Sequence, residues 1–165
     1  MSISSQDALK GFYTAKNAIG APSINSDATF EIEGHEDLVL NTKQFPWPVI
    51  GTFGEIEVVT PMGGMYYKPQ QLKTAQQGPI TFTETVTGRI MRFMEEILRT
   101  GGEFNATVYE GTPDRFVRAY KLKGCFFQPD QPDRDWENRA QITLINGTLF
   151  YNFFGDQLAP NATSL

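Results

Sequence analysis

Histidine and cysteine, two residue types that often serve in catalysis or metal binding, each occur once in the chain, as His35 and Cys125. A single histidine excludes metal sites built from several imidazoles. Its position beside Glu36 and Asp37 in a polar turn favours an exposed loop residue. Cys125 lies in the middle of an apolar segment, which favours a small buried side chain over a nucleophile.

Acidic residues form two patterns that would suit a cation or acid–base chemistry. The first is a run in a proline-containing loop, which lacks the glycine and the spacing of a calcium loop, so a solvated loop is favoured; it comprises Asp130, Asp133, Asp135 and Glu137. In the second, Glu55 and Glu57 project from one strand face about 7 Å apart, a spacing that a glycosidase can use. No aromatic sugar platform lies beside them. We therefore predict no catalytic residue, no metal site, no cofactor and no enzyme activity.

Composition is that of an ordinary folded chain with many aromatic residues. The 165 residues include 13 Phe, 6 Tyr and 2 Trp, which favours strands, cores and interfaces. The net charge of −5 argues against general binding of nucleic acid, which needs clustered Lys and Arg. We expect no membrane span, because no apolar run approaches about 20 residues. We also expect no secretion signal, and the single cysteine fits synthesis in a reducing cytosol.

The N-terminal half predicts an arm followed by short strands. Residues 1–27 have no sustained period and are expected to form an arm, with a weak helical turn around 8–15. Strands are expected near 29–33, 38–40 and 55–60, with Phe30, Ile32, Ile56 and Val58 pointing into the core. The prolines at 46 and 48 make residues 45–48 a loop that carries Phe45 and Trp47. The connection over 61–78 is long, with a possible strand around 65–68.

One segment predicts a helix. Between Gly88 and Thr100, six apolar residues fall on one arc at about 100° per residue: Ile90, Met91, Phe93, Met94, Ile97 and Leu98. Thr87 is a candidate N-cap, and the pair Gly101-Gly102 ends the helix. We expect Ile90, Met94, Ile97 and Leu98 to pack against a sheet.

Strands are predicted on both sides of this helix. A strand over 80–86 precedes it, and strands over 104–109, 116–127, 141–145 and 148–154 follow it. Asn146-Gly147 predicts a tight hairpin turn between the last two. The final strand is apolar on both faces, so it is either covered on both sides or lies at an interface. The expected fold is mainly β: a two-sheet antiparallel sandwich or barrel in one domain over 1–165, with one packed helix at about 87–100 and long loops.

The order of strand, amphipathic helix and returning strands is carried by three segments between Gly78 and Gly155: GPITFTETVTGRIMRFMEEILRTGGEFNATVYEG, RFVRAYKLKGCFFQP and ENRAQITLINGTLFYNFFG. It resembles the tail-tube proteins of contractile-tailed bacteriophages. The tube proteins of type VI secretion systems and of phage-like bacteriocins share this plan. The resemblance implies a structural virion protein of the tail, made in the host cytoplasm. It also implies stacked hexameric rings whose lumen conducts DNA, and partners such as the sheath, tape-measure, baseplate and terminator proteins.

Within that interpretation, two sets of residues are candidates for function. The lumen-facing candidates are Glu31, Glu33, Glu55 and Glu57, because a channel for DNA needs walls that do not bind phosphate. The candidates for contacts between subunits are Tyr66, Tyr67, Leu72, Phe150 and Phe154. Two alternatives stay open: a tube-initiating or baseplate ring of the same fold, and a monomeric β-sandwich that binds a ligand with Phe45 and Trp47.

Overall fold

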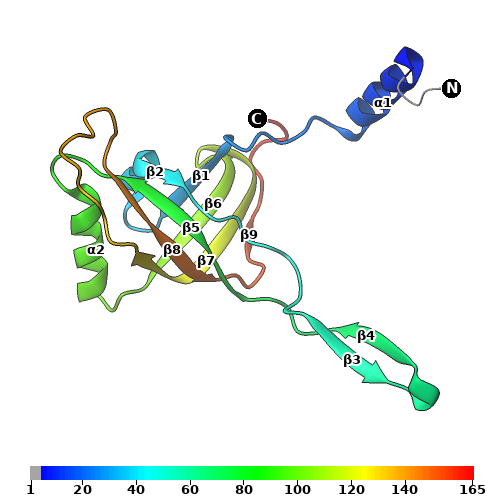
Figure 1. Cartoon of the computed structure of the whole chain (residues 1–165). Coiled ribbons are helices and arrows are strands. Elements are labelled where there is room, and N and C mark those ends of the chain that lie inside the picture. The colour runs from blue at the N-terminus through cyan, green and yellow to red at the C-terminus, as the bar shows by residue number, and fades with distance from the viewer. Residues whose placement is uncertain (1–4) are drawn as a thin grey trace.

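The computed structural model describes residues 5–165 (Figure 1), and the fold is mainly β, as predicted. Seven antiparallel strands form one sheet in the order β1-β6-β7-β8-β5-β2, with β9 paired to β7. This sheet does not close into a barrel. Its strands are β1 (Ala28–Ile32), β2 (Thr42–Gln44), β5 (Ala75–Thr83), β6 (Phe104–Thr112), β7 (Arg115–Pro129), β8 (Leu144–Asn152) and β9 (Gln157–Leu158). A separate two-stranded hairpin is formed by β3 (Glu55–Val59) and β4 (Met65–Pro69).

The long strand β7 bends and so gives the sheet two halves that face each other. Its first part pairs with β6 and β9, and its last part pairs with β8. The pairing register shifts between Lys123 and Phe126, where Gly124 has a positive φ of 58°. Glycine adopts that conformation without steric cost, so it suits a bulge that bends a strand.

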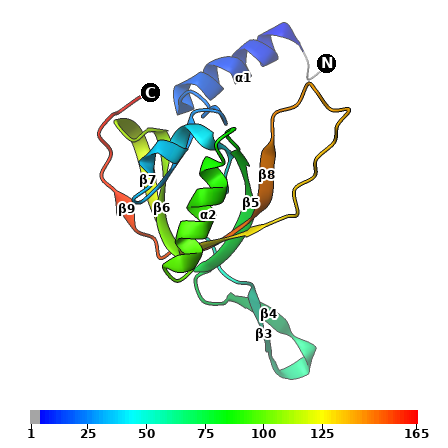
Figure 2. The ribbon, with the colours of Figure 1, turned by 90° about the vertical axis from the view of Figure 1, so that its left-hand side faces the viewer.

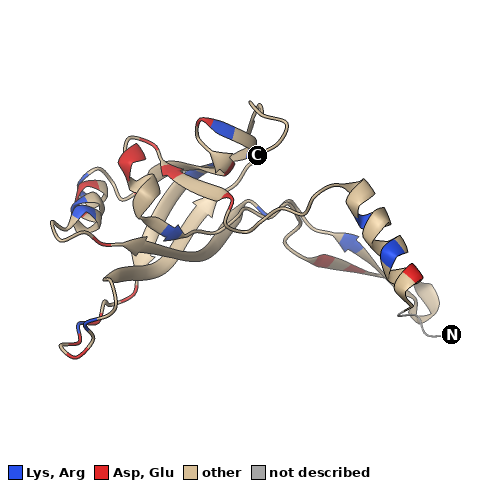
Figure 3. Ribbon diagram, turned by 90° about the horizontal axis from the view of Figure 1, so that it is seen from above, with Lys and Arg blue, Asp and Glu red and all other residues tan. Residues whose placement is uncertain are grey.

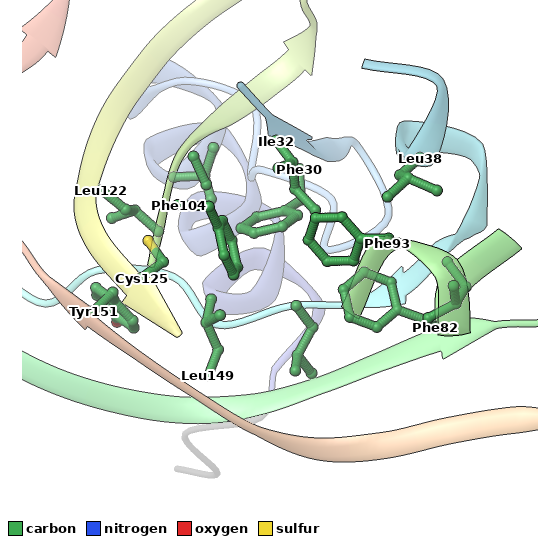
Figure 4. Close-up of a cluster of buried hydrophobic side chains, with 14 of the residues drawn as sticks. Phe30, Ile32, Leu38, Phe82, Phe93, Phe104, Leu122, Cys125, Leu149 and Tyr151 are labelled. Atoms are coloured by element: carbon green, nitrogen blue, oxygen red, sulfur yellow. The ribbon is translucent and has the colours of Figure 1, made fainter. Parts of the chain in front are cut away.

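The core lies between these two halves. Buried side chains from β1, β5, β6, β7 and β8 converge there (Figure 4). Phe93 from helix α2 (Arg89–Arg99) lies among them, with its ring centroid 5.5 Å from that of Phe104 and 6.4 Å from that of Phe82. In Figure 2, α2 lies between β6 and β7 on one side and β5 and β8 on the other, and so covers the open end of the curved sheet.

Helix α2 begins in a different way from the prediction. Its N-cap is Gly88, and no side chain caps it from that position, so Thr87 is not the cap. Instead, the carboxylate of Glu84 accepts hydrogen bonds from the backbone N–H groups of Ile90 and Met91, at 3.0 and 3.1 Å. A negative charge is favourable there because the helix dipole places partial positive charge at the N-terminus. Gly101 and Gly102 follow the helix with positive φ, as expected of its end.

The buried face of α2 is shifted by part of a turn from the predicted one. Ile90 is buried, as predicted, together with Phe93, whereas Met94 and Ile97 are partly buried against the core. Leu98 is 76% exposed, so its predicted burial is wrong. Arg89, one residue before Ile90, donates two hydrogen bonds to the carboxylate of Asp37, at 2.9 and 3.0 Å. This pair ties α2 to the 3-10 helix η1 (Glu36–Asn41), which stands where residues 38–40 were predicted to be a strand.

The predicted hairpin at Asn146-Gly147 is also wrong, because β8 runs straight through it. The glycine serves a close approach between strands. A Cβ on Gly147 would lie 2.4 Å from the backbone oxygen of Gln128 and 2.5 Å from the ring of Phe127. Asn146 accepts a hydrogen bond of 2.9 Å from the hydroxyl of Thr81. Contacts within the sheet therefore explain both residues, a hydrogen bond for Asn146 and close packing for Gly147.

Two elements project from the body at the side opposite α2 (Figures 1 and 3). One is helix α1 (Gln6–Ile19), which is longer than the helical turn predicted for the arm. The other is the β3–β4 hairpin. Ile56 is 48% exposed and Val58 is only partly buried, so neither points into the core as predicted, although Phe30 and Ile32 do. Charged residues of both signs are interspersed over the body and α1.

Candidate assembly interface

The β3–β4 hairpin is a two-stranded ribbon with two different faces. Cross-strand partners share a face, so the pairs Glu55–Pro69, Glu57–Tyr67 and Val59–Met65 form one face, and Ile56–Lys68 and Val58–Tyr66 form the other. Tyr66 and Tyr67 therefore point to opposite sides. Both are exposed, as are Met65 and Val59. The hairpin thus presents an aromatic residue on each face, with two carboxylates beside Tyr67.

The base of the hairpin is a narrow neck. The backbone N–H of Gln70 donates to the oxygen of Gly54 at 2.9 Å, and that of Lys73 donates to the oxygen of Gly51 at 2.9 Å. Thr52 pairs with Leu72, so this third contact candidate lies in the neck, 51% exposed. From residue 49 to residue 75 no side chain is buried.

One buried side chain holds this neck to the body. The amide of Gln76 donates to the oxygens of Val49 and Lys73, at 2.8 and 2.9 Å, and accepts from the N–H of Val49 at 2.9 Å. The hydroxyl of Tyr151 donates to the same amide oxygen at 3.2 Å. Gln76 was not predicted as a structural residue, because a glutamine next to Gln77 in a polar stretch carries no signal that it is buried.

Phe150 and Phe154 belong to the body and not to the hairpin. The ring of Phe150 stacks on that of Phe126, with centroids 4.9 Å apart and an interplanar angle of 7°. Phe154 follows β8 and is 57% exposed. The alternating residues Leu149, Tyr151 and Phe153 are buried. The outer face of β8 is therefore apolar, and it is only partly covered within one chain.

The four acidic candidates lie on two separate elements. Glu31 and Glu33 are on the outer face of the body sheet, where they share a shallow pocket with Lys121 and Lys123. The hydroxyl of Tyr109 donates to Glu31 at 3.2 Å. Burial, together with the charge of Glu31, raises the pKa of Tyr109. Glu55 and Glu57 lie on the projecting hairpin, so the structure does not bring the two pairs together.

No group of acidic, histidine and cysteine side chains in residues 5–165 is arranged to hold a metal ion. His35, expected to be an exposed loop residue, instead lies edge-on to Phe93 at 4.9 Å. Cys125 is fully buried, and burial raises the pKa of its thiol to about 12, so it remains protonated. No helix in the described part of the chain is long and apolar enough to span a membrane.

The two aromatic residues of the alternative ligand-binding site pack against the core. Phe45 stacks on Phe30 with centroids 5.7 Å apart, and Trp47 lies edge-on to Tyr120 at 5.6 Å. They line part of a pocket under residues 23–28, where Glu110 accepts hydrogen bonds from Ser23 and Arg118. Their rings therefore support the fold instead of forming a free platform.

No protein-family model matches the sequence, and no curated protein matches it significantly. Solved structures do match the fold. A chain of the sheath–tube complex of the extracellular contractile injection system PVC, in the extended state, superposes with a TM-score of 0.54 at 13% identity, covering 88% of this chain and 95% of that one. A chain from the tube-terminating cap of the anti-feeding prophage gives a TM-score of 0.55 at 13% identity, covering 81% and 89%.

The baseplate of the anti-feeding prophage supplies a further match, with a TM-score of 0.51 at 12% identity, covering 87% of this chain and 99% of the other. The high coverage in both directions means that the fold is matched over nearly its whole length, while the identity shows likeness of fold alone. The resemblance expected from the order of elements is confirmed at this level. This chain has the fold of chains from a sheath–tube complex, a tube-terminating cap and a baseplate of contractile injection systems.

Proposed function

We propose that this protein is a structural, non-catalytic subunit of a contractile phage tail, which forms stacked hexameric rings around a lumen that conducts DNA. The support is the shared fold, since its solved relatives come from a sheath–tube complex, a tube-terminating cap and a six-fold symmetrised baseplate. In this role the subunit is made in the host cytoplasm, enters the virion tail, and contacts the sheath, tape-measure, baseplate or terminator proteins.

The observation that carries this proposal is the exposed β3–β4 hairpin. A two-stranded hairpin alone is marginally stable in water, and this one has no buried residue within the chain. Its exposed Ile56, Met65, Tyr66 and Tyr67 need a surface to cover them. A neighbouring copy supplies that surface in a ring or a stack of rings. The unpaired backbone N–H and C=O groups at the edges of the open body sheet gain hydrogen-bond partners from a neighbouring copy in the same way.

In such an assembly, Tyr66, Tyr67, Leu72, Phe150 and Phe154 form the contacts between subunits. The acidic residues of one of the two surfaces, Glu31 with Glu33 or Glu55 with Glu57, face the lumen and keep DNA from binding. Because the two pairs lie on different elements, replacing each pair with Lys tests them separately. Slower DNA passage is expected only for the pair that lines the channel.

A second candidate is a ring that starts or ends the tube, or belongs to the baseplate. The structures with this fold include a tube-terminating cap, a sheath/tube terminator and a baseplate, as well as a sheath–tube complex. The two candidates differ in stacking. A tube subunit polymerises into long tubes, whereas an end ring stops after one or two layers.

Electron microscopy of the purified protein at increasing concentration tests the proposal. A matched variant removes residues 55–69 and joins Gly54 to Gln70 through Asn-Gly. Since these two residues are already hydrogen-bonded neighbours, a two-residue turn can close the gap. We expect tubes or rings from the intact protein and folded monomers from the variant. Monomers from the intact protein at all concentrations would refute the proposed function, and tubes from the variant would show that the hairpin is dispensable.

A further inference from the structure

Helix α1 is amphipathic but packs on nothing. No residue of α1 is buried, and Leu9, Phe12, Tyr13 and Ile19 are each more than half exposed. At 100° per residue these four side chains fall within an arc of about 120°. Lys16 lies inside the same arc, one turn after Phe12. The helix therefore presents an apolar stripe that carries one positive charge.

The chain after α1 is attached to the body, so the helix is held beside it on a short tether. Ser23 donates to the carboxylate of Glu110, and the backbone N–H of Gly111 donates to the oxygen of Asp27 at 2.8 Å. Only residues 20–22 separate the end of α1 from Ser23. The tether limits the reach of α1 to surfaces near its own end of the molecule.

An apolar hollow that suits the apolar stripe of α1 lies beside α2, at the opposite end of the body. It has a volume of about 140 Å³ and is lined almost wholly by apolar side chains of α2 and of the neighbouring strands: Met94, Ile97, Leu98, Phe104, Phe127 and Pro129. An apolar cavity of about 150 Å³ accepts a benzene ring, so this hollow has room for one aromatic side chain. Leu98 stands at its rim, largely exposed.

One negative charge, flanked on α2 by Arg92 and Arg99, lies beside the hollow. Glu95 is exposed and lies one turn before Leu98 on the same side of α2. In residues 5–165 neither Glu95 nor Lys16 has an ion-pair partner. Lys16 in the apolar stripe can therefore pair with Glu95 when the stripe covers the hollow.

We propose that α1 of one copy docks on α2 of the next copy, with Phe12 in the hollow and Lys16 opposite Glu95. Docking within one chain is excluded by geometry, since α1 and α2 project from opposite ends of the body (Figures 1 and 3). A donor at one end and an acceptor at the other make a head-to-tail contact, which repeats around a ring or along a filament. This inference rests on the proposed self-assembly and adds a second contact to that of the hairpin.

The test measures the concentration at which the full chain assembles, by sedimentation velocity. We expect Phe12→Asp to raise it by about tenfold or more, as for loss of a central anchor. Lys16→Glu and Glu95→Lys should each weaken assembly, and the two together should restore it. Lys10→Glu, which lies outside the apolar arc of α1, is the matched control and should have no effect. Thermal melts of each variant check folding, which these exposed positions should not disturb.

A second measurement shows directly which surfaces meet. Phe12→Cys protein is mixed with Leu98→Cys protein under mild oxidation, with the buried Cys125 left in place. We expect a disulfide-linked dimer of the two variants, absent when either is oxidised alone. Normal assembly of Phe12→Asp, or failure of the charge exchange to restore assembly, would overturn the inference while the proposed function stands. Intact protein that stays monomeric would refute both.

Discussion

Helices α1 and α2 both carry an apolar stripe, more sharply defined in α2, yet the surroundings of the two stripes differ completely. α2 buries Ile90 and Phe93 against the sheet, whereas α1 buries nothing. In α2 the apolar residues complete the core of this chain. In α1 the same chemistry is left for a contact outside it. An amphipathic pattern therefore specifies that a helix needs a partner, without specifying whether the partner lies in the same molecule.

The largest effect is expected at the centre of α2. Phe93 is 1% exposed and contacts Phe82, Phe104 and His35. Phe93→Ala should lower the free energy of unfolding by about 3–5 kcal/mol, because it leaves a cavity and removes aromatic contacts. Urea denaturation at low protein concentration measures this. A loss below about 1 kcal/mol would contradict the view that α2 completes the core.

Substitutions at two neighbouring residues of α2 locate the edge of its buried face. Ile97 is partly buried against the core, and Leu98 is 76% exposed. We expect Ile97→Ala to cost about 1–2 kcal/mol of stability and Leu98→Ala less than about 0.5 kcal/mol. Equal losses at both positions, measured in the same urea series, would mean that α2 sits rotated from the orientation described.

A pH-dependent contribution to the free energy of unfolding is expected from Glu110, where the segment after α1 meets the body. The pKa of Glu110 is held below its usual value by the hydrogen bond from Ser23, and further by Arg118, against the effect of burial. The ionised carboxylate therefore stabilises the fold above the unfolded pKa of about 4.3, and this contribution is lost as the pH falls through the lower folded pKa.

The matching variant is Glu110→Gln, which keeps the shape and removes the charge. We expect it to be less stable than the intact protein by about 1 kcal/mol near neutral pH. The difference should shrink below a pH of about 4. A difference that stays constant between these two conditions would assign the effect to packing and not to charge.

The smallest effect on stability is expected for Phe12→Ala in α1. Phe12 has the same side chain as Phe93 but is 66% exposed. In dilute monomer the free energy of unfolding should change by less than about 0.5 kcal/mol. A loss above about 1 kcal/mol would show that α1 packs on the body of its own chain, as α2 does.

Local patterns predicted the body well. The strands around Phe30 and Ile32, the helix over residues 89–99 and its glycine end were correct because each depends on nearby residues and on burial. The hairpin predicted at Asn146-Gly147 was wrong because the glycine is needed for another reason. The backbone of β7 passes too close to residue 147 to leave room for a Cβ. No local rule contains that information.

The projecting elements were harder to predict for a different reason. Ile56 and Val58 alternate like core residues, and the sequence does not say that their strand leaves the body. Leu9, Phe12 and Tyr13 indicated only a weak helical turn, because most of the residues around them are polar or small, and the full length of α1 was missed. Of the candidate contact residues, Tyr66, Tyr67 and Leu72 could be placed on a protruding loop because of its length, whereas the neck that holds it depends on Gln76.

The neck at Gly54 and Gln70 has a consequence for how such a protein can change over time. The chain leaves the body and returns to it at two adjacent, hydrogen-bonded positions. The hairpin between these two positions can be lengthened, shortened or exchanged without changing the distance between the two points where the chain joins the body. Selection can therefore adjust the fit between neighbours independently of folding, and a foreign peptide inserted at the turn after Thr60 would be displayed without disturbing the core.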